Sequence, residues 1–459
     1  MLVDEPSRRR EVSAETLARA MLERIERHDV YRALETTTPE LALADARRVD
    51  AARAQKSPLP LDGLPIVVKD NVDVGGVRCG VGSKLFANRV AECDATVVRL
   101  LREAGAIVLG KTCLHEFAFG ATSISILGAC RNPWDPSRIA GGSSGGSGIA
   151  VAADFAVGAL GTDTGGSVRL PAALCGIVGL RPTHGAVSNH GVQPLSPSFD
   201  TVGPMARSAA DASALFAIMR RYDPDDPWSA KAPPHATISG DGLRGLRIAV
   251  LEPFFFEGID PQIDGLIRAA IATLSELGAR IVEFELAGVA EAYRAVTEMA
   301  RAEATAVYEP YLDDPAVEMS DGVRERFALG RKLTGVGFAN ALRVMMRWRR
   351  ELAHVFESSA DLLLTPGVSR PTFPIEGTRN LEATEILTRM TYPWSFAGVP
   401  AICVPCGFRD DGMPVGFQLI AAPWREDLLF AAAERYQSVT SWHRARPKLA
   451  EAVSASGVK

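Results

Sequence analysis

The sequence has no long run of apolar residues. Its longest apolar stretches, such as 149–160, span about a dozen residues and contain Asp154, whereas a membrane-spanning helix needs about 20. The first residues, MLVDEPSRRREVS, have no hydrophobic segment after the arginines, so they do not resemble a secretory signal. We therefore expect no membrane association and a cytoplasmic location.

The sequence also lacks an excess of basic charge and any obvious linker. The formal net charge is −5 over 459 residues, and this gives no broad basic field of the kind that binds phosphate backbones. Nucleic acid is therefore not an expected partner. Hydrophobic residues make up 47% of the chain and are spread evenly, without repeats or low-complexity segments, which predicts one large domain.

Metal-ligand and disulfide patterns are missing as well. Seven cysteines, an odd number in a long chain, fit reduced thiols better than a disulfide framework. Cys403 and Cys406 form one CVPC pair in the strand-like stretch PAICVPCG, but no second CxxC or histidine pair stands at ligand spacing. We predict no metal site and no cofactor.

A Ser-His-Asp site is not indicated either. The sequence contains no GxSxG nucleophile elbow with which His115, His184 or His190 would pair. These histidines lie in the segments HEFAFG and THGAVSNHG. They are more typical of structural or pocket-lining residues.

Hydrophobic periodicity predicts α/β organisation. Ser13 precedes apolar residues at helical spacing and is a candidate N-cap, and a second helix is expected from Thr38 to about Ala54. A strand over 64–68 leads to Lys69. Helices and strands then alternate, with a helix at 95–104, strands at 106–109 and 246–250, a helix at 263–277 and a strand at 280–284.

The segment GAIVLGKT, residues 105–112, matches the phosphate-loop pattern of nucleotide-binding proteins, so a P-loop protein is a remote alternative. A phosphate loop needs a flexible turn between its glycines. Here the intervening residues 106–109 are typical of a buried strand, and no acidic metal site follows. The pattern is therefore interpreted as accidental.

The most informative stretch is GGSSGGSGIAVAADFAVGALGTDTGGS, residues 141–167. It places serines in glycine-rich turns at both ends of a helix–strand unit, and such turns expose backbone N–H groups. Taken singly, these serines are typical of helix caps: Ser143 or Ser144 for a helix through Ile149 and Ala152, and Ser167 for one starting near Val168.

Together with Lys69 in PIVVKDN, the GGSSGGS and GTDTGGS motifs resemble the amidase signature family of serine hydrolases. The blocks NPWDPSRIAGGSSGGS, SFDTVGPMARS, GVPAICVPCG and GMPVGFQLI extend the resemblance over nearly the whole chain. It implies one large twisted mixed β-sheet flanked by helices on both faces. A single domain over 1–459 would comprise N-terminal helices (1–60), a signature core (61–212), a divergent pocket-forming part (213–358) and a C-terminal part of the core (359–459).

The resemblance also implies roles. Ser167 is expected to be the nucleophile, Ser143 the bridging residue on a cis Gly142–Ser143 peptide, and Lys69 the base, with Ser144 in support. A basic Lys69 must have its pKa lowered by about three units through burial. Without the serines, the better interpretation would be a buried ion pair of Lys69 with Asp70 or Asp73.

The GTDTGGS turn is predicted to form an oxyanion hole. The glycines would let the amides of Thr164, Gly165, Gly166 and Ser167 point at one place. Asp163 and Arg169 flank this turn and are expected to fix it, the alternative being a solvated surface pair.

Two functions remain open. The favoured one is a free-standing amidase acting on a small carboxamide, an aryl or arylalkyl amide, anilide or ester being one hypothesis. The alternative is the glutaminase-like A subunit of a tRNA-dependent amidotransferase. The preference depends on RPTHGAVSNHG, where His184 and Asn189 replace the tyrosine and arginine of a YGRVSR-type segment. The aryl hypothesis depends on candidate aromatic residues and on the absence of an evident charged clamp. His184, His190 and Trp394 are candidates for binding the substrate, and a homodimer is the assembly considered.

Overall fold

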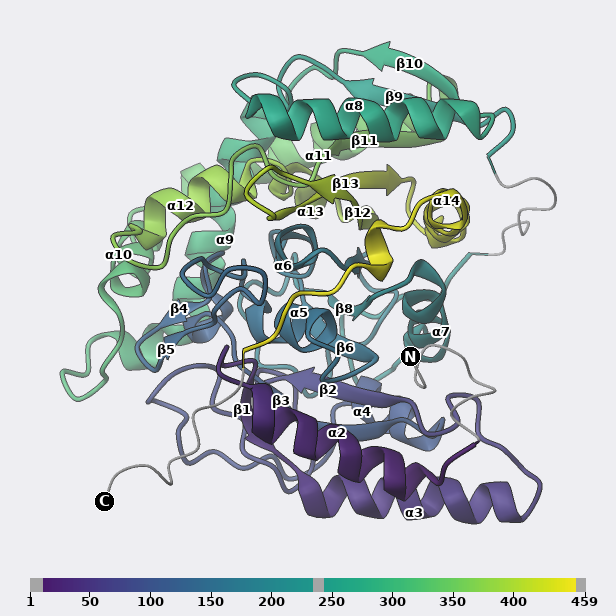
Figure 1. Cartoon of the computed structure of the whole chain (residues 1–459). Coiled ribbons are helices and arrows are strands. Elements are labelled where there is room, and N and C mark those ends of the chain that lie inside the picture. The colour runs from purple at the N-terminus through teal and green to yellow at the C-terminus, as the bar shows by residue number, and fades with distance from the viewer. Residues whose placement is uncertain (1–10, 234–242, 451–459) are drawn as a thin grey trace.

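A computed structural model of the chain describes residues 11–233 and 243–450 (Figure 1). In the first part, the helices and strands are α2 (Ala14–His28), β1 (Leu34–Thr37), α3 (Pro39–Ala54), β2 (Pro65–Lys69), α4 (Thr96–Glu103), β3 (Ile107–Thr112), η1 (Glu116–Ala118), β4 (Ile124–Ser125), β5 (Gly128–Ala129), α5 (Gly145–Ala152), β6 (Gly158–Thr162), α6 (Arg169–Cys175), β7 (Val178–Arg181), β8 (Val202–Ala206) and α7 (Ala209–Met219).

The second part continues the same architecture. Its elements are β9 (Arg247–Leu251), α8 (Pro261–Glu276), β10 (Arg280–Phe284), α9 (Val289–Leu312), α10 (Asp321–Gly330), α11 (Gly335–Ser358), β11 (Leu362–Pro366), α12 (Asn380–Thr388), α13 (Tyr392–Ala397), β12 (Ala401–Phe408), β13 (Pro414–Ala421), α14 (Glu426–Val439) and η2 (Trp442–Arg444).

Within the described residues, eleven strands form one mixed sheet in the order β1-β3-β2-β6-β8-β7-β12-β13-β11-β9-β10. Strand β2 runs parallel to both β3 and β6, the central strands from β6 to β11 pair antiparallel, and β11, β9 and β10 are again parallel. Helices flank this sheet, with α2 and α3 at the β1 end and α8 at the β10 end (Figure 1). The predicted mixed α/β fold is confirmed.

Local expectations from the sequence agree with these elements. The side chain of Ser13 accepts a hydrogen bond from the backbone N–H of Thr16 and caps α2. The predicted helix from Thr38 to Ala54 is α3, and the strand that leads to Lys69 is β2, which includes the lysine itself. Cys403 and Cys406 are buried in β12, where burial raises the pKa of the Cys403 thiol to about 12.

The phosphate-loop interpretation is ruled out by the backbone. Strand β3 continues through Lys111 to Thr112, so the segment has no flexible turn. The Lys111 ammonium is fully buried and forms an ion pair with Asp70 at 3.0 Å. A lysine in a buried ion pair within a strand cannot reach a nucleotide phosphate.

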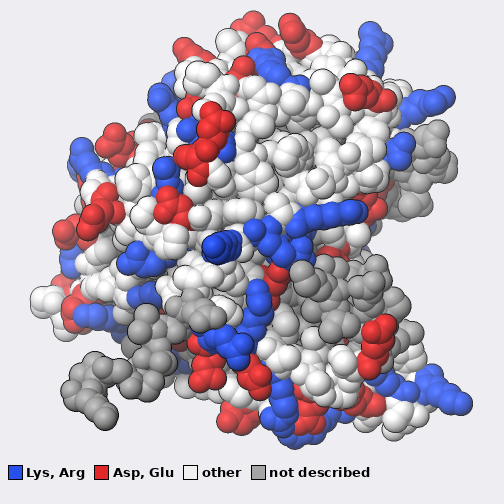
Figure 2. Space-filling view, viewed as in Figure 1, with Lys and Arg blue, Asp and Glu red and all other residues white. Residues whose placement is uncertain are grey.

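Among residues 11–233 and 243–450, no helix is both long and apolar enough to cross a bilayer. On the face shown in Figure 2, acidic and basic side chains are interspersed.

Candidate active site

Parallel strand pairing places Lys69 beside Thr162. Strands β2 and β6 are neighbours in register, with Val68 opposite Leu160, and both end at the same edge of the sheet. The Lys69 Nζ lies 2.7 Å from Thr162 Oγ1 and 2.7 Å from Ser143 Oγ. The amine is therefore held between the end of one strand and the turn that precedes α5.

The alternative ion pairs of Lys69 are not formed. Asp70 pairs with Lys111, and Asp73 binds Arg89 at 2.6 Å. Both neighbouring carboxylates are thus occupied elsewhere, and the nearest partners of Lys69 are hydroxyl groups.

The environment of Lys69 favours a neutral amine. Burial lowers its pKa from 10.5 to about 7, although the charges of Asp163 and Asp200 oppose this shift. The predicted lowering by about three units is met by the full burial of the side chain. A large fraction of the lysine is therefore unprotonated near neutral pH.

The turn before α5 is held tightly around Ser143. The Gly142–Ser143 peptide is cis, as the resemblance implied. The backbone carbonyl of Ser143 accepts hydrogen bonds from the backbone N–H of His115 at 3.0 Å and from the Ser123 hydroxyl at 3.2 Å. A Cβ on Gly142 would come within 2.8 Å of the Ser123 backbone nitrogen, so this position has no room for a side chain.

None of the serines acts as a side-chain helix cap. The N-cap of α5 is Ser144, but its hydroxyl donates to the Thr162 carbonyl at 3.2 Å instead. The N-cap of α6 is Val168 rather than Ser167. The cap interpretation is therefore correct for the position of Ser144 but not for its side chain, and it is wrong for Ser167.

Ser167 lies next to the Ser143 turn. Its backbone carbonyl accepts a hydrogen bond from the backbone N–H of Ser144 at 3.2 Å, and this bond joins the two glycine-rich turns. Ser167 is one of the residues that line a cleft. In the described chain, no hydrogen bond connects the Ser143 and Ser167 hydroxyl groups directly.

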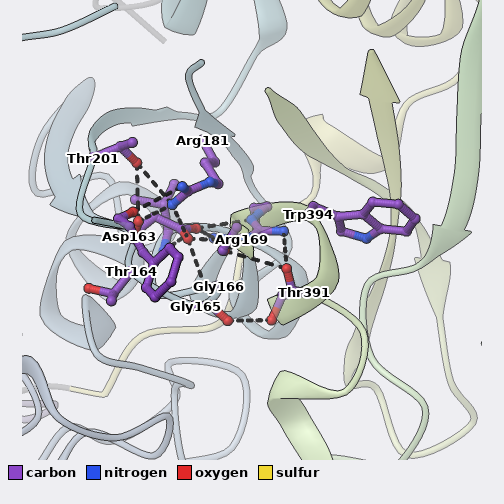
Figure 3. Close-up of polar contacts among 12 residues, drawn as sticks. Asp163, Thr164, Gly165, Gly166, Arg169, Arg181, Thr201, Thr391 and Trp394 are labelled. Atoms are coloured by element: carbon purple, nitrogen blue, oxygen red, sulfur yellow. Dashed lines mark hydrogen bonds and ion pairs between the residues drawn. The ribbon is translucent and has the colours of Figure 1, made fainter. Parts of the chain in front are cut away.

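Asp163 and its partners hold the GTDTGGS turn in place (Figure 3). Its carboxylate pairs with Arg169 at 2.9 Å and with Arg181 at 3.3 Å, and all three side chains are fully buried. Burial alone would raise the pKa of Asp163, but the two guanidinium groups hold it well below its usual range. The surface-pair alternative for Asp163 and Arg169 is wrong, since neither residue reaches solvent.

The backbone amides of the turn are not equivalent. The Gly166 N–H donates to Asp163 Oδ1 at 2.7 Å and is therefore not available to a ligand, contrary to the predicted four-residue hole. In the described residues, no protein acceptor takes the N–H of Thr164, Gly165 or Ser167. A Cβ on Gly165 would overlap the Tyr392 ring, so only glycine allows this close packing.

Ser167 opens into a cleft between the sheet edge and helices α9, α10 and α12. The cleft has a volume of about 30 Å³, so it must widen to admit a ligand larger than water, and it also contains Thr164 and Gly165. Its other lining residues are Ala118, Phe119, Gly120, Ala121, Leu195, Thr297, Arg301, Arg326, Thr384, Glu385, Thr388 and Tyr392. A roomier cavity of about 290 Å³ at the far end of α5 contains none of the predicted catalytic residues.

The three predicted substrate-binding residues lie outside this cleft. His184 Nε2 lies 3.1 Å from the Pro197 carbonyl, and its ring packs on Trp228. His190 is exposed elsewhere. Trp394 is completely buried, stacks on Phe255 and points away from the Asp163 network (Figure 3).

Sequence reasoning missed the charged groups of the cleft. Arg301 and Arg326 come from α9 and α10, in the divergent part of the chain, and Glu385 comes from α12. No motif marks these positions. Thr162 was also missed, although the shared ends of parallel strands β2 and β6 were a usable signal.

Known proteins resemble this chain along nearly its whole length. The Amidase family model matches residues 16–430. The A subunit of glutamyl-tRNA(Gln) amidotransferase from Moorella thermoacetica is 38% identical, with 96% of each chain covered. The solved structure of the corresponding A subunit from Thermotoga maritima has a TM-score of 0.78 and 31% identity, covering 93% of this chain and 92% of that one.

A third relative is a solved structure described as a vestigial protein complex that reveals the origins of an s-triazine catabolic enzyme. Its TM-score is 0.88 at 33% identity, covering 95% of this chain and 97% of that chain.

These relatives contradict the favoured prediction of a free-standing amidase of small carboxamides, because similarity at 38% over nearly the full chain is to one component of an amidotransferase. They equally contradict the expected partners, a small-molecule amide and at most a second copy of the chain, because these relatives are named as subunits of an amidotransferase. The sequence argument failed for a physical reason: His184 and Asn189 do not line the Ser167 cleft, so their identity says little about the substrate.

Proposed function

Because this chain belongs to the Amidase family, whose members cleave amide C–N bonds, we propose that it is the amide-cleaving component of a glutamyl-tRNA(Gln) amidotransferase-type complex. In this role it hydrolyses the side-chain amide of glutamine and supplies ammonia. The relatives are named as subunits of an amidotransferase, and this motivates the expectation that the chain works with partner chains.

The observation that carries this proposal is the guanidinium of Arg326 in the Ser167 cleft. The side chain is almost completely buried and donates to the Phe119 carbonyl at 2.8 Å, the Asn380 carbonyl at 2.6 Å and Thr384 Oγ1 at 2.6 Å. Within residues 11–233 and 243–450, it pairs with no carboxylate.

A buried cation with only neutral partners favours an anionic ligand. Burial lowers the pKa of Arg326 to about 10, so it is still charged at neutral pH. A guanidinium has more N–H donors than these three acceptors use. The α-carboxylate of glutamine is a matching group, because it would compensate the charge while the side-chain amide extends toward Ser167.

The proposed reaction begins with neutral Lys69. As its Nζ accepts the proton of Ser143 Oγ, Ser143 Oγ takes the proton of Ser167 Oγ, and Ser167 Oγ bonds to the amide carbon. Rotation of the Ser167 side chain brings its hydroxyl to Ser143 Oγ. The amides of Thr164, Gly165 and Ser167 stabilise the resulting oxyanion.

The same relay completes the cycle. Protonated Lys69 returns the proton through Ser143 to the departing nitrogen, the C–N bond breaks, and ammonia leaves behind a γ-glutamyl ester on Ser167. Water then attacks this ester while the relay accepts its proton, which releases glutamate and restores the Ser167 hydroxyl.

Two measurements test the proposal. The chain, co-expressed with the other amidotransferase subunits of its host, should co-purify with them and release ammonia from L-glutamine. A fluorophosphonate should label the peptide that contains Ser167, and Ser167→Ala should abolish both labelling and ammonia release. Ammonia release from simple aliphatic amides but not from glutamine would refute the proposed substrate.

A further inference from the structure

The Thr162 hydroxyl lies between two nitrogen donors, of which the relay uses only Lys69. Thr162 Oγ1 is 2.7 Å from Lys69 Nζ, and it accepts a hydrogen bond from Asn71 Nδ2 at 3.1 Å. All three side chains are buried, so these contacts are shielded from bulk solvent. Among the described residues, Thr162 Oγ1 has no third hydrogen-bond partner. Lys69 therefore shares its contact with Thr162 with the Asn71 amide.

The backbone on both sides of Asn71 holds its side chain in this place. Strand β2 ends at Lys69, and the Val72 N–H donates to the Lys69 carbonyl at 2.9 Å, which turns the chain directly after the strand. The Asn71 carbonyl accepts a hydrogen bond from the Gln193 N–H at 2.8 Å. These backbone contacts do not involve the Asn71 side chain, so a substitution at this position leaves them in place.

The Asn71 amide changes what the Thr162 hydroxyl can offer to Lys69. A hydroxyl group has one proton and two lone pairs, and an amide nitrogen can only donate, so Asn71 occupies one lone pair of Thr162 Oγ1. Two donors that share one oxygen compete for its electron density, and Oγ1 is a poorer acceptor for Lys69 as a result. The Thr162 carbonyl lies farther from Nζ, at 3.4 Å. An ammonium on Lys69 is therefore weakly solvated here, and a neutral amine needs fewer acceptors.

Charged and titratable groups face Lys69 from several segments: the carboxylates of Asp163 and Asp200, the imidazole of His115, and the buried ion pair of Asp70 with Lys111. The Asp163 and Asp200 carboxylates favour the ammonium and oppose the lowering of the Lys69 pKa by burial. His115 is neutral, because burial lowers its pKa well below 6.5. Asn71 adds no charge to this set, whereas a carboxylate of the same shape would add a third negative group that favours the ammonium.

We propose that Asn71 is a positioning residue for the Lys69 base: through Thr162 it holds the amine opposite Ser143 Oγ, and it makes the Thr162 oxygen a poorer acceptor for an ammonium, so that the base stays neutral. The proposal rests on the proposed function, because it concerns the base of that relay. It does not depend on glutamine as the substrate. Asn71 touches none of the reacting atoms and acts through the Thr162 hydroxyl alone.

The test combines substitutions with the pH profile of ammonia release by the complex with partner subunits. Asn71→Leu keeps the size of the side chain and removes its donor, and Asn71→Asp keeps the shape and adds a charge. Asn71→Leu is also made in the Thr162→Val background, where it has no hydroxyl to act through. Asn132→Asp is the matched control, because this buried amide donates to the carbonyls of Ile139 and Leu174 instead. Thermal unfolding verifies that every variant is folded.

We expect Asn71→Leu to lower kcat/KM for L-glutamine at pH 7 by about three- to tenfold, and by less than about twofold in the Thr162→Val background, since one hydrogen bond is lost only in the first case. Asn71→Asp should move the midpoint of the kcat/KM profile upward by about one pH unit or more, because the added charge favours the ammonium. Activity that this variant loses at neutral pH should then return in alkaline buffer. Asn132→Asp should leave the midpoint unchanged.

Equal losses from Asn71→Leu in the two backgrounds would overturn the assignment, since Asn71 would then not act through Thr162. An unshifted midpoint in Asn71→Asp, or the same shift in Asn132→Asp, would overturn it as well. If the wild type releases ammonia from a simple aliphatic amide but not from glutamine, the proposed function fails instead, and the same comparison made with that amide still tests Asn71.

Discussion

The pKa of Lys69 leads to a prediction about pH dependence. The relay needs the neutral amine, and burial brings the pKa of this group to about 7. The neutral fraction is then about one tenth at pH 6, one half at pH 7 and nine tenths at pH 8. A lysine that kept the ordinary value of 10.5 would be neutral in about one molecule in 3,000 at pH 7.

Acylation should therefore depend on pH in a defined direction. Between pH 5.5 and 9, kcat/KM for ammonia release should rise about tenfold per pH unit below pH 6, rise about fivefold between pH 6 and 7, and level off above pH 8, since it reports ionisations of the free enzyme. Thermal unfolding at each pH excludes loss of fold as the cause. A profile that is flat down to pH 5.5, or that keeps rising toward pH 10, would refute a buried neutral base.

Four further substitutions test the relay and the parts around it. Ser144→Ala should reduce kcat less than tenfold while Ser143→Ala reduces it by orders of magnitude, because Ser144 Oγ contacts only the Thr162 backbone. Thr162→Val should lower kcat/KM about tenfold, since Lys69 loses a hydrogen bond worth about 1.5 kcal/mol. Asp163→Asn should lower the free energy of unfolding by about 3–5 kcal/mol, because it leaves two buried arginines poorly compensated.

Steady-state kinetics and urea unfolding check these outcomes. Asp135→Asn is the control for Asp163, since Asp135 is partly exposed and its pair with Arg138 should contribute less than about 1 kcal/mol. Similar losses in the two variants would contradict the role of the buried network. Equal activity losses for Ser143→Ala and Ser144→Ala would contradict the assignment of Ser143 as the bridging hydroxyl.

Much of the core was predictable because its signals are local. The helix that starts after Ser13 and the strand that leads to Lys69 follow from apolar periodicity, capping and turn residues. The cis peptide at Ser143 came from the family resemblance alone. The glycine-rich turns around Ser143 and Ser167 were found because their backbone restricts which residues fit.

The substrate cleft could not be predicted in the same way. Arg301, Arg326 and Glu385 converge from helices far apart in the chain, and each looks like an ordinary charged helix residue in the sequence. Only tertiary packing buries Arg326 where no carboxylate of the described residues pairs with it. Conversely, His184 lies near the predicted nucleophile in the sequence and Trp394 was a candidate only as an aromatic residue, but both side chains pack into the protein, so neither signal was a good guide to the cleft.

The amides of the oxyanion turn illustrate an intermediate case. The sequence placed the turn correctly, but not the direction of each N–H. The Asp163 carboxylate accepts a hydrogen bond from the Gly166 N–H. Asp163 is held in this position by its buried ion pair with Arg169, and the sequence alone did not decide whether that pair is buried or at the surface. Whether the Gly166 N–H binds Asp163 or a ligand depends on the geometry of this one turn, which the sequence does not show.

The central claim is that Ser167 attacks the side-chain amide of glutamine. The most direct test is mass spectrometry of the protein, in complex with its partner subunits, after rapid acid quenching during turnover of L-glutamine. The account predicts a mass increase of one γ-glutamyl group on the peptide that contains Ser167, and none in Ser167→Ala. An adduct on Ser143 or another residue, or steady glutamine hydrolysis by Ser167→Ala, would contradict it.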